Sequence, residues 1–92
     1  MNQGALVLDL RTQEKFAEGH LAGARQMSGD ALLSAGDSLK RHKEKPVVVY
    51  DDTGSLGLSA VRQLAAQGFS RAFALRGGIA AWRADNLPVS RA

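Results

Sequence analysis

The sequence contains no cysteine among its 92 residues. This absence excludes disulfide bonds, thiolate metal sites and every mechanism that depends on a cysteine nucleophile. Aromatic residues are also scarce, with one Trp, one Tyr and three Phe, so little ring surface exists for stacking on bases. No apolar run approaches the roughly 20 residues that cross a bilayer. Thiol chemistry is therefore excluded, and nucleic-acid and membrane-spanning classes are disfavoured.

The charge balance is only weakly basic. Twelve Lys and Arg against nine Asp and Glu give a formal net charge of +3, too small an excess to indicate a nucleic-acid partner. Several of these cations gather between Ser38 and Lys45, where they fit a solvated helix end before Pro46 better than a binding patch. With 45% hydrophobic residues, the sequence predicts one small globular domain over residues 1–92.

A buried strand begins almost at the first residue of the sequence. This start predicts that the chain is an excerpt of a longer protein, whose other part could carry an anchor or a targeting signal. The chain as given is expected to be soluble, and its compartment is not indicated because thiol usage offers no guide.

The most informative stretch runs from Val47 to Gly57. Val47 to Tyr50 form an uninterrupted apolar run that is too short for a helix and typical of a strand buried in a parallel sheet. Asp51 to Gly57 leave the carboxyl end of that strand. Ligands of open α/β sheets bind beyond such ends, where the following helix offers unpaired N–H groups to an anion. This loop is therefore the candidate site.

The remaining pattern alternates strands with helices. Thr12 is the expected N-cap of the first helix, which Gly19 ends, and Ser28 or Asp30 is expected to cap the next. Gly68 is expected in the left-handed position after a later helix. This alternation predicts an α/β fold of three layers, a central parallel sheet flanked by helices. The other expected strands are Ala5–Asp9, Arg25–Met27 and Arg71–Leu75, and the other expected helices include a helix end at Ser38–Glu44, Leu58–Gln67 and Ile79–Ala84.

Two long motifs resemble the rhodanese-homology domain family. The family pattern D-x-R-x-x-x-E-[FY]-x-x-G-H-[IL]-x-G-A is matched except at Lys15, which stands where the family usually has Glu. The pattern L-x-G-G-[IV]-x-A-W, followed by L-P-V, is matched near the end of the chain. Together the motifs cover almost the whole sequence, so the resemblance implies a rhodanese-like fold. The matching residues are Asp9, Arg11, Phe16, Gly19, His20, Leu21, Gly23 and Ala24, then Leu75, Gly77, Gly78, Ile79, Ala81, Trp82, Leu87, Pro88 and Val89.

The departure from the family falls on the reacting residue. In active sulfurtransferases of this family the loop resembles C-x-x-G-x-R-S, in which the cysteine carries a persulfide and backbone N–H groups cradle it. The corresponding positions here are Asp51, Gly54, Leu56 and Gly57, so only the glycine is kept. Persulfide transfer needs a polarisable thiolate, and a carboxylate is a far poorer nucleophile toward sulfur. Leu56 also supplies no cation for an anionic donor, and Asp52 adds repulsion.

The sequence therefore predicts a non-catalytic binding or regulatory module that needs no cofactor and no metal. A residual sulfur-related role is left open. The expected partner is another protein or a fused domain, and membrane contact is expected only through a segment that is absent from the sequence. The candidate binding residues are Asp51, Asp52, Thr53, Gly54, Ser55, Leu56 and Gly57 in the loop, with Arg11 and Arg76 as candidate neighbours.

An alternative function comes from the letters DDTG after a buried strand. They resemble the phosphorylatable aspartate motif of haloacid-dehalogenase-type phosphotransferases, in which an aspartate like Asp51 attacks phosphate with Mg²⁺ bound nearby. Such enzymes also need a second acidic cluster and a late lysine. After Gly57 the chain has one acidic residue, Asp85, and no lysine, so this alternative is the weaker one.

Other chemistry-bearing residues are expected to have structural roles. His20 and His42 are far apart in sequence and lack an acidic ligand pattern, so they do not indicate a zinc site. Asp9 and Arg11 are expected to pair with each other and with the backbone. Trp82 is expected to anchor the core.

Overall fold

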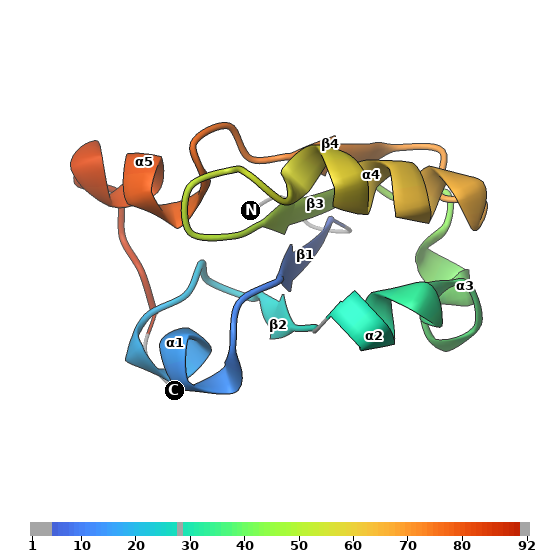
Figure 1. Ribbon diagram of the computed structural model, residues 1–92, viewed down its shortest axis with the longest axis horizontal. Coiled ribbons are helices and arrows are strands. Elements are labelled where there is room, and N and C mark those ends of the chain that lie inside the picture. Colours follow the sequence, from blue (N-terminus) through green and yellow to red (C-terminus); the bar gives the residue numbers. More distant parts are fainter. Residues whose placement is uncertain (1–4, 28, 91–92) are drawn as a thin grey trace.

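The computed structural model describes residues 5–27 and 29–90. Its four strands form one parallel sheet in the order β2-β1-β3-β4 (Figure 1). The central pair is β1, Leu6–Asp9, and β3, Val47–Tyr50, and the sequence predicted a strand at both places. The outer strands are short, β2 at Arg25–Gln26 and β4 at Ala72–Ala74. The predicted α/β class with a parallel sheet is confirmed.

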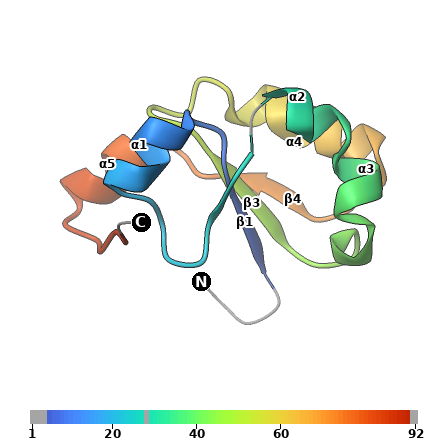
Figure 2. The same ribbon diagram turned by 90° about the horizontal axis from the view of Figure 1, so that it is seen from below.

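Helices cover the sheet from both sides. Figure 2 shows α1 and α5 on one side and α2, α3 and α4 on the other. The three predicted layers are therefore present. The helices are α1, Gln13–Glu18; α2, Gly29–Leu33; α3, Ala35–Ser38; α4, Gly57–Ala66; and α5, Gly78–Ala84, with a 3₁₀ turn, η1, at Lys40–His42.

Alternation along the central strands divides the core into two clusters. Leu8 and Val49 point to the face that α2, α3 and α4 cover, and they belong to the larger cluster with Leu64 of α4. Val7 and Tyr50 point to the opposite face, where they meet Ile79 of α5. Because side chains of a strand alternate between faces, an uninterrupted apolar strand is stable only where both faces are covered. This requirement explains why β1 and β3 lie at the centre.

The expected ends of α1 and α4 are observed. The Thr12 hydroxyl accepts a hydrogen bond from the Lys15 N–H, as an N-cap does. After α4, Gly68 has a φ of +97°, and the Phe69 N–H donates to the Leu64 carbonyl at 3.0 Å. This bond closes a Schellman motif and buries the Phe69 ring in the core. Among residues 5–27 and 29–90, no helix is long and apolar enough to span a membrane.

The segment before β3 differs from its prediction. The expected helix end at Ser38–Glu44 is instead the close of α3 at Ser38, followed by η1. Leu39 interrupts the α-helical path with φ −120° and ψ 25°, and its side chain is buried in the core. Core packing of Leu39 therefore outweighs the helical preference of the residues after it. Asp30 lies inside the first turn of α2 rather than at its cap, and Ser28 lies outside the described residues.

Candidate functional site

The Asp51 side chain is the centre of the loop that follows β3. Its Oδ1 accepts a hydrogen bond from the Gly54 N–H at 2.6 Å, and its Oδ2 accepts bonds from the Leu56 N–H at 2.9 Å and the Ser55 hydroxyl at 3.1 Å. Asp51 is only 4% exposed. The loop therefore folds around its own carboxylate, which occupies the position where converging N–H groups would otherwise hold an external anion.

Glycines of two separate segments give the loop its shape. Gly54 has a φ of +93°, a conformation that residues with a side chain rarely adopt. Gly78 lies so close to the loop that a Cβ there would stand 2.5 Å from the Asp51 carbonyl oxygen. The first N–H groups of α5 hold the same segment, since Ile79 donates to the Asp51 carbonyl and Ala80 to the Asp52 carbonyl, both at 2.9 Å.

Arg11 and Asp9 form a buried ion pair beside the loop. Arg11 Nη2 lies 2.8 Å from Asp9 Oδ2, and the exposed fractions of the two side chains are 4% and 0%. The guanidinium also donates from Nε to the Asp9 carboxylate and from Nη2 to the Gly19 carbonyl oxygen. The predicted pairing is confirmed. Arg11 faces the site, but most of its hydrogen-bonding capacity is already used within the protein.

Lys15 meets Asp52 at the mouth of the site. Lys15 Nζ lies 2.8 Å from Asp52 Oδ2, and Arg11 Nη1 lies 3.8 Å from Asp52 Oδ1. About half of each side chain in the Lys15–Asp52 pair remains exposed. The sequence prediction placed Asp52 in the site but did not include Lys15. The mismatch at position 15 was the signal that could have found it, because Lys15 there provides a cation that can pair with an acidic residue of the loop.

These residues surround a hollow of about 460 Å³. Two of the predicted site residues, Gly54 and Gly57, do not line the hollow. The Gly54 N–H donates to the Asp51 carboxylate, and Gly57 packs against Ala74. Arg76 is exposed in the turn before α5 and does not line the hollow. Leu10, Thr12 and Lys15 line it without having been predicted. The lining residues are Leu10, Arg11, Thr12, Lys15, Asp51, Asp52, Thr53, Ser55 and Leu56.

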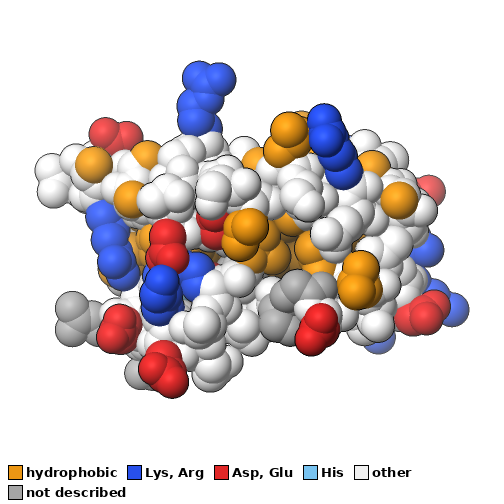
Figure 3. All heavy atoms as spheres, viewed as in Figure 1, with side chains coloured by type: hydrophobic (Ala, Val, Ile, Leu, Met, Phe, Trp, Pro, Cys, Tyr) orange, Lys and Arg blue, Asp and Glu red, His pale blue; other side chains and the backbone are white. Residues whose placement is uncertain are grey.

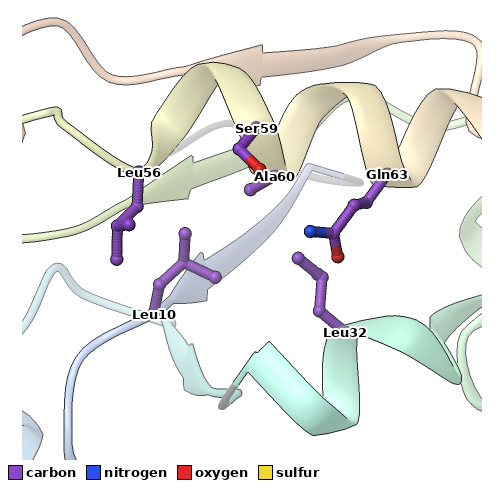
Figure 4. Close-up of a pocket in the computed structure, with 6 residues that line it drawn as sticks. All are labelled: Leu10, Leu32, Leu56, Ser59, Ala60 and Gln63. Carbon is purple, nitrogen blue, oxygen red and sulfur yellow. The ribbon is translucent and has the colours of Figure 1, made fainter.

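A smaller apolar pocket opens next to the hollow. It has a volume of about 100 Å³ and lies between α2 and the beginning of α4. Figure 4 shows Leu10 and Leu56 pointing toward one another at one end of the pocket, and Leu32 and Gln63 approaching each other at the other end. Leu10 and Leu56 line both cavities, so the two form one continuous depression.

Tyr50 is buried next to Asp9 and Arg11. Its hydroxyl oxygen accepts a hydrogen bond from the Leu21 N–H at 3.0 Å, and the residue is fully buried. Burial raises the pKa of the Tyr50 phenol above its ordinary value, and the neighbouring Asp9 carboxylate raises it further. The Tyr50 phenol therefore stays neutral in the folded protein.

We expect an alkaline loss of stability that originates at Tyr50. Since the folded state favours the protonated phenol, its contribution is fully present below a pH of about 10 and is lost as the pH rises toward the higher folded pKa. Tyr50 is the single tyrosine of the chain, so phenolate absorbance reports on it alone. The absorbance should rise together with the loss of circular dichroism. A phenolate titration near its ordinary pKa in a protein that stays folded would contradict this expectation.

Comparison with known proteins decides the family. The sequence model of the rhodanese-like domain family matches residues 1–85. The chain is a rhodanese-like domain. Solved structures agree with this: the Alr3790 protein from Anabaena sp. superposes with a TM-score of 0.86 and 30% identity over 99% of this chain and 72% of that one. The BH2092 protein from Bacillus halodurans gives a TM-score of 0.82 and 32% identity over 97% and 65% of the two chains.

Two curated relatives differ in what their names state. The uncharacterized protein YibN of Escherichia coli strain K12 is 34% identical over 90 residues, and this rhodanese-like domain spans 63% of its length. Thiosulfate sulfurtransferase GlpE of Coxiella burnetii is 36% identical over 87 residues, which cover 95% of this chain and 78% of that enzyme. The domain is thus a cysteine-free relative of sulfurtransferases.

The phosphotransfer alternative gains no support. The comparisons place the chain in the rhodanese-like family, and both carboxylate oxygens of Asp51 already accept hydrogen bonds from the loop. A magnesium-dependent aspartyl phosphotransferase needs further acidic ligands close by. Within residues 5–27 and 29–90, no group of three or more His, Asp or Glu side chains could hold a metal ion.

Proposed function

We propose that this rhodanese-like domain is a non-catalytic binding module whose working surface is the Asp51–Gly57 loop and the hollow beside it. The observation that carries the proposal is the Asp51 carboxylate, held by two backbone N–H groups and one hydroxyl in the position of the reacting group. The cradle is retained and already filled by a side chain that cannot form a persulfide. Its partner would be another protein or a fused domain, with no cofactor.

The charges around the hollow also favour a role other than sulfur transfer. Turnover of thiosulfate would require a free cation near the loop, and Arg11 is taken up by Asp9 while Lys15 is engaged by Asp52. Leu56 stands at the loop position where the active-family motif has an arginine. An anionic donor would thus meet Asp51 and Asp52 without a dedicated counter-charge. These features support binding of something other than a small sulfur anion.

A thiosulfate:cyanide sulfurtransferase assay tests this function. We expect the purified protein to form no more thiocyanate than a boiled sample, whatever the pH or the sulfur donor, because no residue can accept the sulfane sulfur covalently. A thiosulfate sulfurtransferase such as GlpE, assayed in parallel, is the positive control. Cyanide-dependent thiocyanate formation that copurifies with the folded domain would overturn the proposal and revive the residual sulfur-related role.

A further inference from the structure

Apolar and charged side chains lie together on one face of the domain. In Figure 3 hydrophobic side chains line a depression between upper and lower parts of the molecule, and acidic and basic side chains lie directly beside it. The depression combines the apolar pocket and the charged hollow, which share Leu10 and Leu56. We call this combined depression the bipartite surface. Its two halves present different chemistry to a single ligand.

The apolar half is incompletely covered. Leu56 at its rim is 53% exposed, although its side chain is a large apolar one. Exposed apolar surface that is rimmed by polar side chains marks interaction sites on soluble domains. The apolar half has a volume of about 100 Å³, which suits one aliphatic side chain. The apolar half therefore fits a side chain of a partner.

Gln63 adds a polar group to the same pocket. Its Oε1 is buried and has no hydrogen-bond partner among the described residues. A side-chain amide has both a donor and an acceptor, and rotation about its last torsion can present either one to the pocket. A peptide main chain offers the complementary groups. This unsatisfied amide therefore favours a polypeptide as the occupant.

The charged half is locally acidic in a chain that is basic overall. Three carboxylates, those of Asp9, Asp51 and Asp52, and two cations, those of Arg11 and Lys15, lie in or beside the hollow, whereas the whole chain carries +3. Arg11 is buried against Asp9 and cannot leave. The Lys15–Asp52 pair is half exposed, and such pairs are weak. A cation from outside can therefore replace Lys15 at the Asp52 carboxylate.

We propose that the bipartite surface binds a protein segment that carries a basic side chain close to an aliphatic one. The aliphatic side chain fills the pocket between Leu10, Leu32 and Leu56, and the basic side chain pairs with Asp52. This inference rests on the proposed binding function and names the chemistry of its partner. Charge complementarity favours a basic segment over an acidic one. The apolar pocket favours a segment that also carries an aliphatic side chain over one that carries only basic side chains.

Three capped peptides of equal length test the inference by nuclear magnetic resonance titration of the labelled domain. One contains adjacent Leu and Lys, the second Leu and Glu, and the third Ser and Lys. We expect saturable shifts of the Leu10, Leu56 and Ser59 amide signals with the Leu-Lys peptide, weakening as salt is added. The other two peptides should bind more weakly. Equal binding of the Leu-Glu peptide, or no saturable shift with any peptide, would overturn the inference.

Two variants test separately how the charged half and the apolar half of the bipartite surface contribute to binding. Asp52→Asn removes the charge and should weaken binding of the Leu-Lys peptide by about threefold, as expected for an exposed pair. Leu56→Ser should weaken both leucine peptides by about fivefold through lost apolar contact. The matched controls are Asp85→Asn and Leu87→Ser, which change an exposed acid and an exposed leucine outside both cavities. If the controls weaken binding as much as the paired variants, the surface is misassigned.

Light scattering tests whether a second copy of the chain, rather than another protein, covers the apolar half. A dimeric domain that becomes monomeric with Leu56→Ser would show that a second copy covers the pocket, and would overturn the inference. The sulfurtransferase assay stays independent of these results. An inactive protein that binds no peptide leaves the proposed function standing and removes only this partner, whereas a catalytically active protein removes the proposed function itself.

Discussion

Asp9→Ala should lower the free energy of unfolding by about 3–5 kcal/mol, the cost of leaving one member of a buried ion pair without its partner. Asp9 is fully buried, and it accepts hydrogen bonds from the Arg11 backbone and guanidinium. Without it the Arg11 charge would be held in the interior with the Gly19 carbonyl, the Tyr50 ring and the more distant Asp52 nearby, and without a close carboxylate. Urea denaturation followed by circular dichroism measures the change.

The double variant Asp9→Ala with Arg11→Met distinguishes the cost of an unpaired buried charge from the cost of a general packing defect. Removing both charges should recover part of the lost stability, because no unpaired charge then remains buried. Asp85→Ala, which changes an exposed carboxylate, should have little effect. The interpretation fails if Asp9→Ala costs no more than Asp85→Ala, or if adding Arg11→Met makes the protein less stable still.

Asp51→Cys should introduce the reactive thiol that the wild-type domain lacks. The Gly54 and Leu56 N–H groups that now bind the carboxylate would stabilise a thiolate, so the new thiol should have a lowered pKa and be reactive. The thiolate would attack the outer sulfur of a sulfane donor, break its S–S bond and become a persulfide, with sulfite leaving when the donor is thiosulfate. Cyanide would then take that sulfur as thiocyanate and regenerate the thiolate. Mass spectrometry detects the added sulfur.

Leu56→Arg should act on top of Asp51→Cys and only for charged donors. In the single variant thiosulfate should react poorly, because Asp52 remains and Arg11 is bound to Asp9. An arginine at position 56 supplies a charge-assisted contact of about 1.5–3 kcal/mol, which corresponds to at least tenfold faster use of thiosulfate. A neutral sulfane donor should gain little. If folded Asp51→Cys takes up sulfur from no donor, the loop is not a working cradle.

The central part of the fold follows directly from local sequence patterns. Val47–Tyr50 is an apolar run that only a doubly covered strand can accommodate, and Gly68 followed by Phe69 encodes the end of α4 through one left-handed residue and one buried ring. The α3–η1 region was not predictable in this way. Its path depends on Leu39 reaching the core, and that contact exists only after distant elements have assembled.

The candidate site also has one part that the local sequence predicts and another part that depends on the tertiary structure. Asp51, Ser55 and Leu56 lie within five residues of one another, so a family motif and simple hydrogen-bond chemistry indicated their association. Lys15 meets Asp52 across 37 positions of sequence, and Leu10 reaches Leu56 across the depression. Such pairings arise from the tertiary arrangement, and a single sequence carries no local signal for them. Arg76, predicted as a neighbour of the loop, does not line the hollow.

The glycine contacts behind the loop bear on how the domain evolved. Gly54 approaches Gly77 so closely that a Cβ would come within 3.0 Å of its nitrogen, and Gly78 packs against the Asp51 and Asp52 backbone. These contacts hold the loop backbone in addition to the hydrogen bonds that the Asp51 carboxylate accepts. Selection on folding alone can therefore preserve the glycines of the family motif, whether or not the loop catalyses a reaction.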